Sequence, residues 1–445
     1  PVAQICPLNG GRKMLTHLLF TDLAGKLRRV TLRIDGNPEL LEGLETIVDG
    51  SSLLGFLRVE ESDLLVKPVS SRPIVTRYVE GKHFISGLFK NKTTRYNKDP
   101  RLVAERLVEY LSDAGLEARV GVELEFYIVE SVESRLTPVS QILNVKLIEE
   151  AEFPQSSLWF VKTYDSPGED RVGKLLSSVL AELEKNELYF SKVHRENGPR
   201  GQVEVSTPAA TPIETADFVQ LFKYMARVVG DREGFRPVLL AKPFPDDYGS
   251  GMHVHVSLWQ GASNIFEEEG KLSDEALYFI GGLLEHARSL TAFTNPTVNS
   301  YRRLVEGFEA PVYVSWGLGN RTTTVRVPAQ HQSRVEYRPP DPTSNPYLSI
   351  SAIIMAGLDG IRRKIAPGEP TSRNLFEDGS GWSTSGRVLP RSLEEALEEL
   401  ESDNEYLRPV FDRELLESYI ELKKREAKAF RSYPTPVDYL FYLEY

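Results

Sequence analysis

Two short stretches of the chain carry ionisable side chains at every second position. Glu123 and Glu125 alternate with apolar residues in one stretch, and His253 and His255 do so in the other. Successive side chains of a β-strand point to opposite faces, so each pair is predicted to share one face while apolar residues pack behind it. The same alternation returns in three further stretches, residues 201–205, 321–327 and 334–338.

These five stretches are rich in glutamate, histidine and arginine. A half-buried sheet with one face in water explains any single alternating stretch. Carboxylates crowded onto one surface, however, repel one another unless cations or arginine side chains lie among them. The whole set therefore favours a sheet that carries a metal-bearing cavity.

Composition and charge limit the class of protein. The chain has 445 residues, of which 41% are hydrophobic and 26% charged, as in ordinary globular proteins. Its net charge of -11 argues against a nucleic-acid-binding surface. Cys6 has no second cysteine for an internal disulfide, and neither a signal core nor a run of about 18 apolar residues is visible. We expect a cytoplasmic protein that binds neither nucleic acid nor membrane.

Apolar spacing predicts the elements that would position the polar stretches. A strand-rich segment comes first, and we place a domain boundary between residues 98 and 99, in a turn-like run before the first helix. The acidic run at residues 267–270 is expected to turn a hairpin in water. The early strands are expected at residues 15–20, 27–34 and 64–68, and helices at 101–114, 173–186, 213–229, 273–293, 347–361, 393–401 and 413–430.

Several short motifs resemble, in order and along nearly the full chain, those of the glutamine synthetase family, type I. Any one of them could occur by chance, but their shared order and spacing are not expected by chance. The motifs are Phe20 to Lys26, Asp49-Gly50-Ser51-Ser52, Glu61-Ser62-Asp63, His194 to Glu204, Lys242-Pro243, Gly249 to His255, Asn295 to Leu304, Gly307 to Pro311, Asn320-Arg321, Pro340-Asp341-Pro342 and Asn345-Pro346-Tyr347.

The resemblance implies an α+β fold with two domains. Residues 1–98 would form a small amino-terminal β-grasp domain. Residues 99–445 would form a large catalytic domain with a curved antiparallel half-barrel sheet backed by helices. The resemblance also implies a homo-oligomer, a dodecamer of two hexameric rings, whose active sites are built between subunits.

The resemblance further implies two or more metal ions in each half-barrel. One ion would be held by three glutamates, and another by two glutamates and a histidine. Carried over by position, the first set is Glu125, Glu196 and Glu204, and the second is Glu123, His253 and Glu336. Mostly carboxylate ligands, with no cysteine among them, favour Mg²⁺ or Mn²⁺ over zinc.

Arginines beside these ligands suit transfer of the γ-phosphoryl group of ATP, because negative charge gathers on its oxygens in the transition state. By the resemblance, some of them bind the nucleotide and others bind the carboxylates of glutamate. The nucleotide and its phosphates are assigned to His255, Ser257, Arg321, Arg326 and Arg334, and the amino-acid substrate to Gly249, Arg303 and Arg338.

The second half of the reaction needs an amine that has lost a proton and an acyl phosphate shielded from water. The resemblance implies that Asp49 of a neighbouring subunit deprotonates ammonium, with Ser52 of the same motif as a substrate contact. Glu309 would lie on a flap that closes the site and would accept a later proton, and Tyr164 would line the ammonium pocket. Asp49, Glu309 and Arg321 are therefore the expected catalytic residues.

The chain departs from the family pattern at three places. Tyr248 stands where the family has an asparagine that contacts glutamate, which would reshape the amino-acid pocket. Between Glu196 and Glu204 the chain reads Asn-Gly-Pro-Arg-Gly-Gln-Val, where the family has something close to Val-Ala-Thr-Ala-Gly-Gln-Asn. Phe376 lies where one bacterial subtype has an adenylylated tyrosine, so that regulation is not expected.

Three hypotheses follow. The leading one is glutamine synthetase chemistry, in which glutamate, ammonia and ATP give glutamine, ADP and phosphate through γ-glutamyl phosphate. The alternative is a γ-glutamyl-amine ligase that uses a polyamine, ethanolamine or methylamine. Tyr248 and the altered loop favour this alternative, whereas Asp49 and Glu309 favour ammonia. The third hypothesis is a structural or regulatory family member without catalysis, against which the complete set of six expected metal ligands argues.

Overall fold

The computed structural model describes residues 13–442 apart from 36–42, 138, 149–162, 165–169, 331–332 and 377–386. Contacts divide the chain into two compact units, Pro1–Leu102 and Val103–Tyr445. Cys6 lies outside the described residues. In the part of the chain that is described, no helix is long and apolar enough to cross a membrane.

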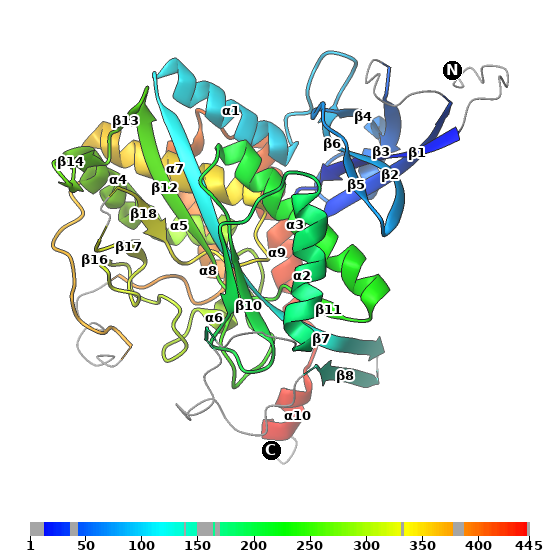
Figure 1. Cartoon of the computed structure of the whole chain (residues 1–445). Helices are drawn as coiled ribbons and strands as arrows, with labels where there is room; N and C mark the ends of the chain where they lie inside the picture. The colour runs from blue at the N-terminus through cyan, green and yellow to red at the C-terminus, as the bar shows by residue number, and fades with distance from the viewer. Residues whose placement is uncertain are drawn as a thin grey trace. The chain divides into compact units, whose positions relative to one another are not determined.

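The first unit is built on a six-stranded sheet in the order β2-β1-β6-β4-β3, with β5 also paired to β6 (Figure 1). β1 and β6 are parallel, and the other neighbours are antiparallel. The three early strands expected from apolar spacing are confirmed as β1, β2 and β4. The elements are β1 (Lys13–Thr21), β2 (Leu27–Asp35), β3 (Thr46–Asp49), β4 (Asp63–Pro68), β5 (Ile74–Thr76) and β6 (Val79–Phe89), with short 3₁₀ turns η1 (Gly50–Ser52) and η2 (Val59–Glu61).

The second unit contains a ten-stranded sheet in the order β16-β17-β18-β12-β7-β10-β9, with β11, β13 and β8 paired at its sides. Its pairs are antiparallel except β16 with β17. The strands are β7 (Glu117–Thr137), β8 (Ser140–Leu147), β9 (Lys192–Arg195), β10 (Gln202–Ser206), β11 (Arg236–Val238), β12 (Met252–Gln260), β13 (Ser263–Asn264), β16 (Trp316–Leu318), β17 (Val325–Val327) and β18 (Val335–Tyr337). The acidic run forms the expected hairpin, β14 (Glu267–Glu268) with β15 (Lys271–Leu272).

Helices back this curved sheet (Figure 1), with α3 against β7 and α4 against β17. The expected helices are present except that one of them is divided in two, and the α+β fold class with its half-barrel sheet is confirmed. The helices are α1 (Pro100–Asp113), α2 (Arg171–Glu184), α3 (Pro212–Glu233), α4 (Asp274–Glu285), α5 (Ala287–Thr294), α6 (Ser300–Arg303), α7 (Pro346–Arg363), α8 (Leu393–Ser402), α9 (Arg413–Arg431) and α10 (Pro436–Tyr442), with the 3₁₀ turn η4 (Glu405–Leu407) between α8 and α9.

Two expectations from the sequence need correction. The single helix expected over residues 273–293 is two helices, because the chain breaks at His286, which ends α4 and begins α5. The strand expected over 321–327 is limited to Val325–Val327. Asn320 causes the second difference, since its side-chain oxygen accepts hydrogen bonds from the backbone and hydroxyl of Thr322 and holds the preceding residues in a turn.

Candidate active site

The strand register places expected metal ligands opposite one another. Glu204 of β10 pairs with Glu125 of β7, and Glu123 of β7 pairs with His253 of β12. Directly opposite residues of an antiparallel pair extend their side chains from the same face of the sheet. The alternation in the sequence therefore becomes a single acidic surface that crosses three strands.

One cluster on this surface contains the three members of the second expected metal site. Ligand atoms of Glu123, His253 and Glu336 all lie within 4.8 Å of one another. His253 Nδ1 is 3.2 Å from Glu123 Oε2 and 3.6 Å from Glu336 Oε1. Burial, together with the charge of Arg338, lowers the pKa of His253, which favours the neutral imidazole that binds metals.

A second cluster contains two members of the first expected site and one histidine that was not predicted. Ligand atoms of His194, Glu196 and Glu204 also lie within 4.8 Å of one another. His194 Nε2 is 3.2 Å from Glu204 Oε1, and His194 Nδ1 is 3.5 Å from Glu196 Oε1. The signal that could have revealed His194 is its place two residues before Glu196, which continues the alternating pattern.

Glu125, the third expected member of that site, pairs with Glu204 of the second cluster in the strand register and also approaches His253 of the first. Its Oε2 accepts a hydrogen bond from the Gly251 N–H at 2.7 Å, and its Oε1 is 3.7 Å from His253 Nε2. Burial and the nearby Glu196 carboxylate raise the pKa of Glu125 to about 8. Burial and Glu204 raise the pKa of Glu196 to about 6. Buried, mutually repelling oxygens of this kind are a donor set that fits a hard divalent cation.

Two adjoining cavities meet at this surface. The smaller, of about 270 Å³, is lined by Glu123 and most of the residues assigned to the metals and substrate. The larger, of about 370 Å³, is also lined by Glu123 and contains His255, Ser257 and Arg334. The smaller cavity is lined by Glu123, Glu125, Thr163, Tyr164, Glu196, Asn197, Gln202, Glu204, Tyr248, Gly249, His253, Arg303, Phe308, Glu309, Arg321 and Arg338.

Arg303 extends along the wall of the smaller cavity. Its side chain occupies space that is available only because residues 249 and 251 are glycines. A Cβ atom on Gly249 would lie 2.6 Å from Arg303 Cγ, and one on Gly251 would lie 2.7 Å from its Nη2. The buried guanidinium donates a hydrogen bond to the Pro339 carbonyl at 2.6 Å. The glycines of the Gly249-Ser250-Gly251 motif are thus explained by close packing against this arginine.

Two other expected arginines flank Glu336. Arg338 Nη1 and Arg326 Nη1 each lie 2.5 Å from a carboxylate oxygen of Glu336, which is completely buried. Burial opposes ionisation, but the charges of Arg338, His255 and His253 together outweigh it and lower the pKa of Glu336 to about 2. Arg334 approaches the larger cavity differently, with its Nε donating to His255 Nδ1 at 3.3 Å.

Asp49 and Ser52 belong to the first unit, whereas all residues that line the two cavities belong to the second. The hydroxyl groups of Ser51 and Ser52 each donate to the Asp49 carboxylate at 2.6 Å. These hydrogen bonds lower the pKa of Asp49 to about 2. The aspartate is therefore ionised at neutral pH.

Glu309 and Tyr164 both line the smaller cavity, and both have left-handed backbone conformations, with φ of 57° and 62°. Asn197, which was not predicted as a site residue, donates a hydrogen bond to Glu309 Oε2 at 2.9 Å. The Tyr164 ring lies 4.7 Å from the His194 ring, measured between centroids. Tyr248, the departure from the family pattern, is half-buried and lines the same cavity.

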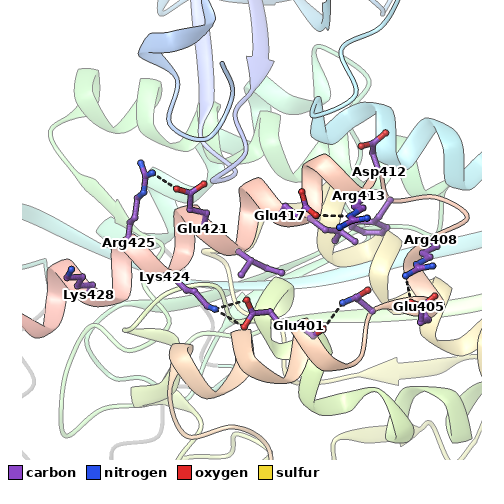
Figure 2. A pocket seen from close by; sticks show the side chains of 14 residues that line it. Glu401, Glu405, Arg408, Asp412, Arg413, Glu417, Glu421, Lys424, Arg425 and Lys428 are labelled. Carbon is purple, nitrogen blue, oxygen red and sulfur yellow. Dashed lines mark hydrogen bonds and ion pairs between the residues drawn. The ribbon is translucent and has the colours of Figure 1, made fainter. Parts of the chain in front are cut away.

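A groove of about 1150 Å³ runs along α8, η4 and α9 (Figure 2). Its charged side chains pair with one another, as between Lys424 and Glu401 at 2.6 Å and between Arg413 and Glu417 at 2.7 Å. Paired charges of this kind leave little net field for a charged ligand. The two smaller cavities, where carboxylates and arginines converge, are the better candidates for chemistry.

This fold and site define an α+β enzyme whose half-barrel sheet carries an acidic, arginine-lined active site. The family model for the glutamine synthetase catalytic domain matches residues 97–442. A glutamine synthetase of Sulfolobus acidocaldarius is 38% identical, over 96% of this chain and 95% of the relative. One of Streptomyces filamentosus is 36% identical over the same shares. A solved structure named GmaS/ADP complex superposes with a TM-score of 0.83, at 26% identity and 97% coverage of both chains. The chain belongs to the glutamine synthetase family, a family of ATP-dependent ligases, as its motifs predicted.

Proposed function

We propose that this enzyme is a glutamine synthetase, which uses ATP to join glutamate and ammonia through γ-glutamyl phosphate. The observation that carries the proposal is the junction of the two cavities at Glu123. Residues expected to contact the nucleotide line one cavity, and residues expected to contact glutamate line the other. A γ-phosphate bound in the first cavity and a γ-carboxylate bound in the second would meet at the acidic surface, where phosphoryl transfer needs cations.

Two divalent cations, Mg²⁺ or Mn²⁺, would be held on this surface. The oxygen-rich clusters fit them by donor type and by spacing. Glu123, His253 and Glu336 would form one site, and Glu196 and Glu204 would form the other with Glu125 or His194. When bound, the cations would supply positive charge to the phosphoryl oxygens.

The nucleotide would occupy the larger cavity, near His255, Ser257 and Arg334. The structural relative named GmaS/ADP complex binds ADP, which supports a nucleotide site in this fold. Arg321 lines the smaller cavity, where it would stabilise the transferred phosphoryl group. Arg326 forms an ion pair with Glu336 and would bind the phosphates of the nucleotide from that position.

Glutamate would lie in the smaller cavity, where Arg303, Arg338 and Gly249 form part of the wall. An arginine is well suited to a carboxylate, because its planar guanidinium can donate two parallel hydrogen bonds. Glu309 would close this cavity and accept a proton from the attacking nitrogen. Tyr164, beside His194, would line the ammonium site.

Asp49 would deprotonate ammonium from the amino-terminal domain of a neighbouring subunit. An ionised carboxylate suits this role because it attracts the cation before taking its proton, and Asp49 is ionised at neutral pH. This assignment requires an oligomer, and we propose a cytoplasmic dodecamer of two hexameric rings. A monomer in light scattering would contradict the role of Asp49.

Release of phosphate from ATP tests the proposal. The enzyme is supplied with glutamate, ammonium and Mg²⁺ or Mn²⁺, and glutamine is measured by mass spectrometry. We expect one phosphate for each glutamine and no turnover after removal of the metal with a chelator. Metal-independent turnover, or phosphate release without any amide, would contradict the proposal.

A second candidate function is ligation of glutamate to an organic amine. The departure at Tyr248 motivates it, because a phenol in place of the family's asparagine changes the wall of the cavity that would hold the substrates. The same assay with methylamine, ethanolamine and a polyamine separates the two candidates. Turnover with ammonium supports glutamine synthetase, and turnover with an organic amine alone would support the second candidate.

A further inference from the structure

Asn197 connects an expected metal ligand to an expected catalytic residue. Its backbone N–H donates to Glu196 Oε2 at 3.0 Å, and its side-chain Nδ2 donates to Glu309 Oε2 at 2.9 Å. Glu196, Asn197 and Glu309 line the same cavity. One residue of the altered loop therefore contacts both the acidic surface and the segment that carries Glu309.

The orientation of the Asn197 amide is fixed from its other end. Thr163 Oγ1 donates to Asn197 Oδ1, so the amide oxygen faces Thr163 and the NH₂ group faces Glu309. An amide has its donors and its acceptor on different atoms, and rotation would place an oxygen against the Glu309 carboxylate. The two partners together leave one favourable orientation.

The loop that carries Asn197 is held tightly at the next residue. Gly198 N–H donates to Gln202 Oε1 at 2.8 Å. A Cβ atom on Gly198 would lie 2.2 Å from the Tyr127 hydroxyl oxygen, so a larger residue cannot take this place without a shift of the tyrosine. This packing fixes the backbone from which Asn197 reaches Glu309.

Glu309 needs such a contact. Its φ of 57° is in the left-handed region, which is strained for a residue other than glycine. Conformations of this kind persist where surrounding contacts determine them. The Asn197 amide is one such contact, and a hydrogen bond to an ionised carboxylate is stronger than one between neutral groups.

We propose that Asn197 is a positioning residue that holds the Glu309 carboxylate over the cavity, so that the acyl phosphate reacts with the amine and not with water. The inference rests on the proposed function. In the productive step, the ammonia nitrogen attacks the γ-carbonyl carbon and forms the C–N bond. The C–O bond to phosphate breaks, phosphate leaves with the electron pair, and Glu309 takes a proton from the nitrogen. When Glu309 is not held, water attacks the same carbon and returns glutamate and phosphate.

The ratio of phosphate released to amide formed tests this inference. Asn197→Asp keeps the shape of the side chain but replaces the donor with a carboxylate that repels Glu309, and Asn197→Ala removes the contact. Loss of a hydrogen bond to a charged group is expected to raise the ratio about tenfold above the wild-type value of one. A role limited to folding would lower phosphate and amide together and leave the ratio unchanged.

Asn144→Asp is the matched control, because Asn144 Nδ2 donates to Glu133 Oε2 at 3.3 Å in an exposed hairpin of β7 and β8. It should keep the ratio of one. Unchanged ratios in both Asn197 variants would overturn this inference but not the proposed function. Complete loss of turnover in folded variants that still bind ADP would do the same. If Asn197→Asp does not fold, the ratio of phosphate to amide measured for Asn197→Ala tests the inference by itself. A wild-type enzyme that forms no amide would instead overturn the proposed function.

Discussion

Arg200 Nη1 lies 3.1 Å from Asp247 Oδ2, and Asp247 immediately precedes Tyr248 in the chain. Arg200 comes from the altered loop between two expected metal ligands, and Tyr248 is the other departure from the family pattern that lies at the cavity. The two departures are therefore joined by one ion pair. Arg200 also bonds Asp246 at 3.0 Å, so the guanidinium bridges both acids that lead into the Tyr248 segment.

Arg200→Ala should destabilise the enzyme and weaken substrate binding. The Asp247 side chain is completely buried, and burial raises its pKa, so loss of the arginine leaves a carboxylate that water does not reach. Removing one partner of a buried pair costs about 3 kcal/mol in the free energy of unfolding. We also expect KM for glutamate to rise several-fold while KM for ATP stays unchanged. Loss of the ion pair would loosen only the segment that carries Tyr248, which lines the smaller cavity.

Arg236→Ala is the control for this experiment. Arg236 pairs with Asp231 at 2.6 Å, but both side chains are at least half exposed, so the pair should contribute less than about 1 kcal/mol. Urea denaturation and steady-state kinetics measure the two effects. Equal stability losses in the two variants, or equal changes in both KM values for Arg200→Ala, would contradict the prediction.

Glu336→Gln should lower the affinity for Mn²⁺. The amide keeps the size of the side chain but removes the charge that lies between Arg326 and Arg338, and the two arginines would then repel the cation without compensation. An affinity loss of about 100-fold is expected, measured by titration calorimetry or by the electron paramagnetic resonance signal of free Mn²⁺. Glu130→Gln, on a partly exposed glutamate paired with Lys146, should leave the affinity unchanged. An unaltered Mn²⁺ titration of Glu336→Gln would exclude it as a ligand.

How much of the site could be predicted from the sequence depends on whether each interaction is local or joins distant parts of the chain. Alternation within one strand is local, so it identified Glu123, Glu125 and His253 as residues of one polar face. Which strands are neighbours is a long-range property, and the pairing of Glu204 with Glu125 appears only in the register. The contact between Asn197 and Glu309 joins residues 112 positions apart, and no periodicity signals it.

Local patterns also failed where a polar side chain overrides the backbone. Apolar spacing continues from α4 into α5, so a single helix was expected, but His286 at the break bonds two carboxylates from other elements. Asn320 likewise delays the start of the expected strand, because its own side chain forms a turn there. His194 was missed for a different reason. Its place two residues before Glu196 puts it in the alternating pattern, but only its neighbours in the fold, Glu196 and Glu204, mark it as a candidate ligand.

Tyr248→Ala should change the choice of amine. The phenol occupies part of the wall of a cavity of only about 270 Å³, so its removal leaves room in the cavity for the alkyl group of a larger amine. A difference of this size in a pocket is worth about 1 to 3 kcal/mol. We expect the ratio of kcat/KM for methylamine to that for ammonium to rise at least about tenfold. Tyr433→Ala, at an exposed tyrosine outside the cavity, should leave the ratio unchanged. An unchanged ratio in Tyr248→Ala would exclude this side chain as a determinant of amine size.

His286 should stabilise the enzyme most strongly at acidic pH. Its Nε2 lies 2.9 Å from Asp359 Oδ2 and its Nδ1 lies 2.8 Å from Asp403 Oδ2, so a protonated ring can bond both carboxylates. Burial disfavours the charged ring, but the hydrogen bonds to Asp403 and Asp359 outweigh it and raise the pKa of His286. Because the pKa is higher in the folded than in the unfolded chain, the stabilisation is complete below about pH 6.5 and is lost as the pH rises through the folded value.

His286→Gln should therefore lower the free energy of unfolding by about 3 kcal/mol at pH 6 and by less at pH 9. Urea denaturation at the two pH values measures the difference. His83 is the matched control with the opposite sign, since burial and the charge of His17 lower its pKa to about 4. The stability that His83 contributes is present above about pH 6.5 and is lost as the pH falls, so His83→Gln should cost no more at pH 6 than at pH 9. A loss for His286→Gln that is equal at both pH values would show that the imidazole acts there as a neutral group.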